Sequence, residues 1–506
     1  MIFFLIYALF LGWAIYYFCK KYDLDFKIVF WVWLFKVIFI FLISYSDLRK
    51  CSFLNVPDED NYFHDALMFY SLAKEDLFYY FKILLDIEPE KVEIYNKYFT
   101  TTNAWFKAPE FFYNDNRWVV KVHSLFVFLS NGELSVHRLF SGFISIIGGL
   151  ILFGYFNEII ERIFEKQFHE NIKQRISVVF VVSQLFPAYF FYTSFVLKES
   201  LLLFLLALIL LFIKRFFEEK LNWKVLIIIL MLILIGITFR PVYIIPTVCF
   251  SILFWIVIRY INNKHRFLAF IVLCFIILLF FSSIFKIVFN KNILELAQYR
   301  QERFLDASRG GIFLVNDKKF VRVPYDWNNV RIDSLNGISV VRIKKNVPLM
   351  YWYLVNFNDT IFEINRDSIE EYKLVYFIEK ANRTVYIPTL NKNASIFQNI
   401  HSIVEALKVF FFYPRDIEGI LDIVVWFENI ILLLLFFAVT ILMIKDKRYS
   451  YYAYLLIWLG SIILIIAVTS PNTGAIVRYR YFILPILFIN FALHSIIKGK
   501  ENAFKN

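Results

Sequence analysis

The stretch that decides the fold is residues 225–239, VLIIILMLILIGITF, which contains no charged side chain. A second long apolar run, FLAFIVLCFIILLFFSSIFKIVF, covers residues 267–289 and contains one charged side chain, Lys286. As helices, such runs are long enough to cross a hydrocarbon core of about 30 Å. The 506-residue chain is 60% hydrophobic and 21% aromatic, whereas a soluble domain is closer to half apolar. Because the alternation typical of transmembrane β-strands is missing, the sequence predicts an all-α polytopic membrane protein.

Hydropathy predicts about eleven transmembrane helices. Their approximate limits are 2–19, 28–46, 135–157, 176–194, 199–214, 224–239, 241–260, 266–289, 420–444, 450–469 and 480–497. Two intervening segments are too long and too polar to be turns. The expected parts are therefore two leading helices (1–46), a first polar segment (47–134), a transmembrane core (135–289), a second polar segment (290–419) and C-terminal helices (420–506).

The short loops predict the orientation in the membrane. Five of them are basic, and alternating spans place all five on one side: 20–27, 213–224, 262–266, 445–450 and 498–506. Basic short loops favour the cytoplasmic side. We therefore expect a multi-pass protein of the bacterial inner (cytoplasmic) membrane, with its amino terminus and both polar segments facing the periplasm or exterior. Topology also accounts for the net charge of +12, so no nucleic-acid partner is expected.

The two polar segments differ in pattern. In the first, residues 65–86 and 119–140 carry apolar side chains at helical spacing, which predicts helices lying in the membrane interface. The second contains short runs rich in β-branched and aromatic residues, bounded by turn residues. These runs are 311–315, 319–324, 338–344, 373–379 and 384–388. They predict a small mixed or β-rich extracytoplasmic domain.

An acidic cluster follows the second predicted span, in the stretch NVPDEDNYFHDALMF at residues 55–69. Asp58, Glu59 and Asp60 precede Tyr62 there. A carboxylate beside aromatic side chains can act as a general base, although a solvated acidic loop explains the same pattern. Asp58 and Asp60 could together hold a divalent cation. That pair is short and common, so no metal or other cofactor is expected.

Further charged residues lie at the predicted outer ends of other spans. Lys198 and Glu199 stand between the fourth and fifth spans, Arg240 precedes Pro241, and Arg478 and Arg480 precede the last span. Each could simply anchor a helix end in the interface. Together they would surround an acidic base with cations that match phosphate oxygens. This combination suits a substrate with a phosphate-linked head group and a tail in the bilayer.

Two acidic residues, Asp422 and Glu428, lie inside the ninth predicted span. Charged groups at that depth usually face protein or a cavity. Their role could be catalytic, substrate-binding or structural, and the sequence leaves these alternatives open.

The motif DEDNYFHDA at residues 58–66 resembles the Asp-Glu-x-x-Tyr motif in the first outer loop of GT-C superfamily glycosyltransferases. This group includes the protein O-mannosyltransferases and the lipid A aminoarabinose transferases, which are glycosyltransferase family 39-like membrane proteins. Three further stretches are similar to that group in layout: 125–156, 185–200 and 474–493. The resemblance covers roughly residues 50–260 and the last span.

The resemblance implies an enzyme that moves a sugar from a polyprenyl-phosphate donor to a lipid, glycan or protein acceptor of the cell envelope, with inversion. Asp58 would be the general base and Glu59 its partner in the motif. The substrate-binding residues would be Asp60, Tyr62, Lys198, Glu199, Arg240, Arg478 and Arg480. Of these, the lysine and the three arginines would stabilise the departing lipid phosphate.

Two other functions fit the same pattern. An O-antigen-type polysaccharide polymerase would use outward arginines against a polyprenyl pyrophosphate and need no acidic first loop. A transporter or flippase of lipid-linked glycans would use Asp422 and Glu428 as coupling residues, although the chain shows no repeated half. A purely structural or binding role is the remaining alternative.

Overall fold

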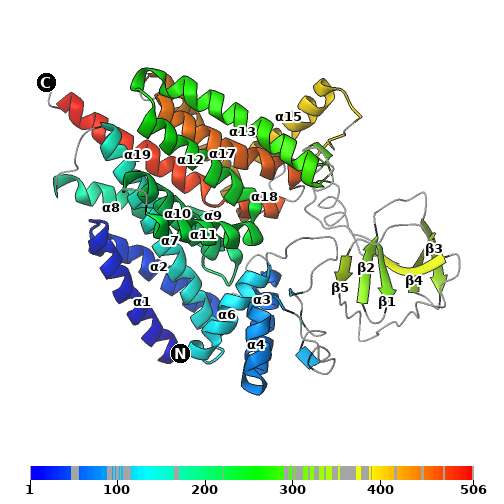
Figure 1. Ribbon diagram of the computed structural model, residues 1–506. Helices are drawn as coiled ribbons and strands as arrows, with labels where there is room; N and C mark the ends of the chain where they lie inside the picture. The colour runs from blue at the N-terminus through cyan, green and yellow to red at the C-terminus, as the bar shows by residue number, and fades with distance from the viewer. Residues whose placement is uncertain are drawn as a thin grey trace.

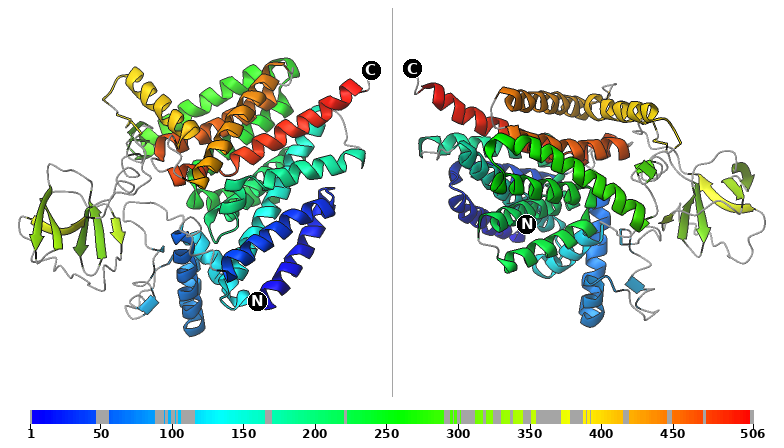
Figure 2. Two further views of the ribbon diagram at one scale, coloured as in Figure 1. Left: turned by 180° about the vertical axis from the view of Figure 1, so that it is seen from behind. Right: turned by 45° about the horizontal axis from the view of Figure 1, so that its top comes forward.

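The computed structural model describes most of the helical chain and parts of the polar segments. The described residues are 2–46, 56–87, 94, 97–98, 102, 104–105, 116–164, 170–219, 222–289, 294–295, 297–298, 301, 312–316, 319–323, 330–335, 338–344, 351–353, 372–377, 387–388, 390–391, 393–414, 419–445, 449–470 and 473–503. Figure 1 shows a bundle of long helices with a small sheet to one side, and Figure 2 shows the same arrangement from two further directions.

The helices follow the predicted spans closely. Those of the N-terminal half are α1 (Ile2–Lys21), α2 (Phe26–Tyr45), α3 (Pro57–Glu75), α4 (Leu77–Leu84), α6 (Asn116–Ser130), α7 (Leu134–Phe164), α8 (Glu170–Gln184), α9 (Pro187–Tyr192) and α10 (Lys198–Glu218). Those that follow are α11 (Trp223–Phe239), α12 (Pro241–Tyr260), α13 (Arg266–Phe289), α15 (Ile396–Phe412), α16 (Ile420–Lys445), α17 (Tyr449–Thr469), α18 (Thr473–Tyr479) and α19 (Ile483–Ala503).

Seven of the described helices are long and apolar enough to cross a membrane: α1, α2, α7, α10, α12, α16 and α17. Three shorter apolar helical stretches lie in α11, α13 and α19. The chain is therefore a polytopic α-helical membrane protein, and the figure of eleven spans stays a prediction. The fourth predicted span differs from the structure, because residues 176–194 fall on two helices, α8 and α9. Pro187 opens α9 and cannot donate a backbone hydrogen bond to α8.

Helix α7 lies at the centre of the bundle, and 83% of its most apolar stretch is buried inside the protein. It packs against α10, α1 and α2. A Cβ atom at Gly148 would lie 3.0 Å from the backbone of Phe204, so a glycine there allows α7 and α10 to approach closely. The N-terminal ends of α7 and α10 carry three of the charged residues of the candidate site, Arg138, Lys198 and Glu199.

Both predicted interfacial helices are interrupted. Asp76 ends α3, and its Oδ1 accepts hydrogen bonds from the N–H groups of Phe78 and Tyr79, both at 3.1 Å, which begins α4. Residues 119–140 divide between α6 and α7 because Asn131 and Gly132 adopt positive φ angles of 52° and 74°. This turn directs α7 into the bundle.

The second polar segment contains six strands: β1 (Ile312–Asn316), β2 (Lys319–Val323), β3 (Val330–Leu335), β4 (Ile338–Lys344), β5 (Tyr351–Tyr353) and β6 (Tyr372–Phe377). They form one sheet in the order β3-β4-β6-β1-β2-β5. The described pairings are antiparallel, for example Val341 opposite Val375. The runs at 311–315, 319–324, 338–344 and 373–379 fall on β1, β2, β4 and β6, whereas 384–388 lies mostly outside the described residues.

Helix α15 follows the sheet and was not expected from the sequence. A capping box between Ser395 and Gln398 begins it, and it packs against α16 and α17. Its outer face exposes apolar side chains at helical spacing, with Phe397 84% exposed. The exposed set is Ile396, Phe397, Ile400, Val404 and Phe412. Because α15 leads directly towards the membrane helix α16, we expect this face to lie in lipid.

A spin label can test where α15 lies. With the four native cysteines replaced by alanine, a nitroxide on Phe397→Cys in nanodiscs should be relaxed more strongly by oxygen than by a water-soluble nickel chelate. The control is a label on Asp23→Cys in the exposed α1–α2 turn, which should show the reverse. Equal water accessibility at the two positions would contradict the interfacial placement of α15.

Candidate functional site

The acidic motif forms the first turn of α3. Pro57 occupies the first helical position, which suits its fixed φ, and Asp58, Glu59 and Asp60 complete the turn. Acidic side chains are favourable there because the helix dipole is positive at that end. Successive residues on a helix point about 100° apart, so neighbouring acids face different surroundings. The Asp58 side chain is 48% exposed, whereas that of Glu59 is 1% exposed.

Glu59 is the centre of a buried ion pair. Its carboxylate accepts hydrogen bonds from Nε and Nη2 of Arg138 at 2.9 and 2.5 Å. Oε1 also accepts from the backbone N–H of Val196 at 2.9 Å, and Nη1 of Arg138 donates to Ser44 Oγ at 2.9 Å. The pair therefore ties α3 to α7, to the end of α2 and to the segment before α10. Glu59 does not reach the surface, and its geometry favours a positioning role over contact with a substrate.

Arg478 brings two carboxylates together from distant parts of the chain. Its Nε and Nη2 donate to Oε1 and Oε2 of Glu199 at 2.5 and 3.2 Å, and its Nη1 donates to Oδ2 of Asp58. Burial would lower the pKa of the Arg478 guanidinium, but the charges of Glu199 and Asp58 raise that pKa well above its ordinary value. Arg478 therefore stays protonated and holds Asp58 and Glu199 in place.

A second group of polar side chains adjoins this one. Asn116 Oδ1 accepts hydrogen bonds from the Tyr62 hydroxyl and from Lys198 Nζ, both at 2.9 Å. Lys198 Nζ lies 6.0 Å from the centre of the Tyr62 ring, and Tyr62 is close enough to Arg478 to interact with its charge. Asn116 was not singled out from the sequence, because a lone asparagine at the start of a helix gives no chemical signal.

Arg240 lies beside the same cluster. Its guanidinium stacks 4.1 Å from the centre of the Tyr479 ring, next in the chain to Arg478. The Tyr243 hydroxyl donates to the Tyr479 carbonyl at 3.0 Å, and the Tyr481 hydroxyl donates to the Glu199 carbonyl at 2.7 Å. Arg240 is partly exposed. The turn between α11 and α12 is thereby held against the segment that carries Arg478.

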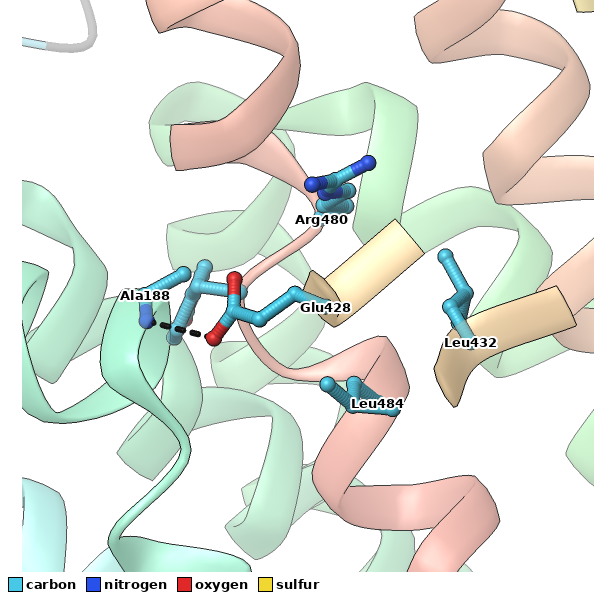
Figure 3. A pocket seen from close by; sticks show the side chains of 6 residues that line it. Ala188, Glu428, Leu432, Arg480 and Leu484 are labelled. Atoms are coloured by element: carbon cyan, nitrogen blue, oxygen red, sulfur yellow. Dashed lines mark hydrogen bonds between the residues drawn. The ribbon is translucent and has the colours of Figure 1, made fainter. Parts of the chain in front are cut away.

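Two predicted site residues lie apart from the others. Arg480 is buried and lines a small cavity together with Glu428, so it does not join Arg478 (Figure 3). Asp60 is exposed on the first turn of α3. Within the part of the chain that the structure describes, no group of three or more His, Cys, Asp or Glu side chains could hold a metal ion. Asp58 contacts Arg478 in this structure.

The site also contains a lysine that sequence reasoning passed over. Lys36 lies in the middle of α2 and is completely buried. Its Nζ donates to Thr193 Oγ1 at 2.7 Å, to Ser194 Oγ at 3.4 Å and to the Phe190 carbonyl at 3.5 Å. These acceptors lie where α9 ends, just before Lys198 and Glu199. An ionisable residue inside a predicted span was the available signal.

Replacing Lys36 by methionine tests this contact. An ordinary hydrogen bond contributes about 0.5–1.5 kcal/mol net, so we expect the loss of these bonds in Lys36→Met to lower the free energy of unfolding by roughly 1–3 kcal/mol. Denaturant titration in mixed micelles would measure the loss. Lys27→Met, at the exposed start of α2, is the matched control and should change little. Equal stability of the two variants would show that the buried Lys36 side chain does not hold the end of α9.

Comparisons of the chain with protein family models, with curated proteins and with solved structures found no match. The fold defines the class, a multi-pass membrane protein.

Proposed function

We propose that the protein is a GT-C-like membrane glycosyltransferase. It transfers a sugar from a polyprenyl-phosphate donor to a glycan, lipid or protein acceptor of the cell envelope, on the extracytoplasmic side of a bacterial inner membrane. The observation that carries the proposal is the half-exposed Asp58 carboxylate, paired with Arg478 where α3, α10 and α18 meet. Eleven spans with an outer amino terminus remain part of the proposal.

In the proposed reaction, Asp58 is the general base. The acceptor hydroxyl attacks the anomeric carbon as its proton passes to the Asp58 carboxylate. The bond between the anomeric carbon and the phosphate oxygen breaks, and its electron pair leaves with the polyprenyl phosphate. Because attack comes from the face opposite the leaving group, the anomeric configuration inverts. Arg478 positions the base, Glu199 orients Arg478, and Glu59 with Arg138 fixes the first turn of α3.

The leaving phosphate gains negative charge as the bond breaks, and cations placed there lower the barrier. Arg240, on the rim of the cluster, and Lys198, beside Tyr62, are the residues that would bind it. Arginine suits this role because its planar fork of donors matches phosphate oxygens. In this proposal Arg480 takes no part in phosphate binding, since it lies in its own cavity.

A donor-consumption assay tests the proposed function. The purified full chain, in proteoliposomes with a bacterial membrane extract as acceptor source, would be given a panel of labelled donors that contains polyprenyl-phosphate hexoses and polyprenyl-pyrophosphate oligosaccharides. We expect at least one donor to be consumed, with release of polyprenyl phosphate and label in a new product. Movement of the labelled lipid between leaflets without consumption would instead indicate a flippase. Consumption restricted to pyrophosphate-linked oligosaccharides would indicate a polymerase.

A further inference from the structure

Arg478 and Arg480 are two residues apart, yet their side chains enter different sites. Arg478 joins Asp58 and Glu199, whereas Arg480 points into a small cavity between α9, α16 and the linker from α18 to α19. Figure 3 shows this cavity with Arg480 on one side and Glu428 on the other. Its lining residues are Ala188, Glu428, Leu432, Arg480, Tyr481 and Leu484.

Arg480 has an unused hydrogen-bond donor in this cavity. The residue is 4% exposed, and its Nη1 donates to the Phe410 carbonyl at 3.3 Å. Its Nη2 is buried and has no hydrogen-bond partner in the described structure. A buried charged donor without a partner is unfavourable. A polar atom is therefore expected to occupy the space in front of Nη2.

Glu428 provides the opposite charge. It is 4% exposed, and its Oε1 accepts a hydrogen bond from the Ala188 N–H at 2.8 Å. Among the residues drawn in Figure 3, a hydrogen bond joins Ala188 to Glu428 but none joins Glu428 to Arg480. Both charged side chains thus line the cavity, and no described hydrogen bond or ion pair joins them directly.

The surroundings restrict what can bind there. An anion would be repelled by Glu428 and a cation by Arg480, while Leu432 and Leu484 make the remaining wall apolar. A neutral group that accepts a hydrogen bond from the guanidinium through a lone pair, and donates one O–H to the carboxylate, can bind both charged side chains. We propose that this cavity binds a hydroxyl group, which accepts a hydrogen bond from Arg480 Nη2 and donates one to Glu428.

Two sources could supply that hydroxyl: a buried water molecule or a hydroxyl of the transferred sugar. The second source rests on the proposed function. Helix α9 packs against α16, which carries Glu428, and against α18, which carries Arg478. Helix α9 therefore adjoins both charged sites, which is consistent with one sugar reaching from Asp58 towards the cavity.

The test combines density maps with donor binding. Cryo-EM maps of the full chain in nanodiscs are recorded with and without a polyprenyl-phosphate hexose that the protein consumes, and the map with the donor should show density between Arg480 and Glu428. Donor affinity is then measured for the natural chain and for Glu428→Gln, in which the amide oxygen can still accept from Ala188. Glu405→Gln on α15, a surface variant, is the matched control.

Each outcome decides the question. If the sugar supplies the hydroxyl, Glu428→Gln should weaken donor binding about 10–100-fold. A donor whose sugar lacks that hydroxyl should bind the natural chain more weakly by the same factor. Glu428→Gln should then cause no further loss of affinity for this deoxy-sugar donor. If water supplies it, the density should persist without donor and the affinity should stay unchanged. An empty cavity in both maps, or a direct ion pair between Arg480 and Glu428, would overturn the proposal. None of these outcomes depends on whether Asp58 is the general base.

Discussion

Asp58→Asn is expected to lower the rate of sugar transfer by about 10²–10⁴-fold. Asparagine is close in size to aspartate and can still accept the hydrogen bond from Arg478, but it cannot take a proton from the acceptor hydroxyl. The loss should therefore appear in the maximal rate, with little change in thermal stability. Donor consumption in proteoliposomes, with unfolding measured on the same preparations, checks both expectations.

The matched control for this variant is Glu75→Gln. Glu75 lies at the other end of α3, its side chain is 49% exposed, and it pairs with Lys97, much as Asp58 pairs with Arg478. It should keep full activity. If Asp58→Asn transfers sugar as fast as Glu75→Gln, then Asp58 is not the base, and a polymerase that needs no acidic first loop becomes the better interpretation.

Arg138→Met is expected to give the largest loss of stability among the variants considered. It leaves the Glu59 carboxylate buried without its cation, and breaking a buried ion pair in this way costs about 3–5 kcal/mol. Activity should fall as well, because the pair positions the first turn of α3 and therefore Asp58. Denaturant titration in mixed micelles would measure the free energy of unfolding.

Two further variants separate the ion pair from general damage. Arg162→Met removes a surface pair with Glu218, in which the arginine is largely exposed, and should cost no more than about 1 kcal/mol. The double variant Glu59→Leu, Arg138→Met leaves no unpaired charge and should be more stable than Arg138→Met alone. If Arg138→Met alone were as stable as Arg162→Met, then Glu59 and Arg138 would not be a buried ion pair.

The membrane helices could be predicted well because long apolar runs have few alternatives to helices in lipid. The breaks inside these helices were harder to predict. Pro187 signalled the division between α8 and α9, but the run around it is apolar enough to look like one span. The turn at Asn131 and Gly132 was likewise read as helix, because its neighbours keep helical spacing.

Within the candidate site, the sequence predicted that Asp58, Glu199 and Arg478 belong together, and the structure places them in contact. It could not show that Glu59 and Arg480 face elsewhere. Which way a side chain points depends on how each helix is rotated about its axis, and packing against other helices sets that rotation. Arg138 is a charged residue inside the third predicted span, which was an available signal, whereas Asn116 has no charge or spacing signal and could be recognised only from its contacts.

Cross-linking tests most directly the central claim, that α3 and the segment before α19 meet at one charged site. In the cysteine-free chain, the pair Asp58→Cys and Arg478→Cys should be joined in nanodiscs by a short bifunctional thiol-reactive cross-linker, which fills the space left by the arginine side chain, and the product is detected by mass spectrometry. The control pair is Glu75→Cys with Arg478→Cys, since position 75 lies roughly 25 Å further along α3. Rapid cross-linking of the first pair alone is the predicted result. Equal or absent cross-linking in both pairs would contradict it.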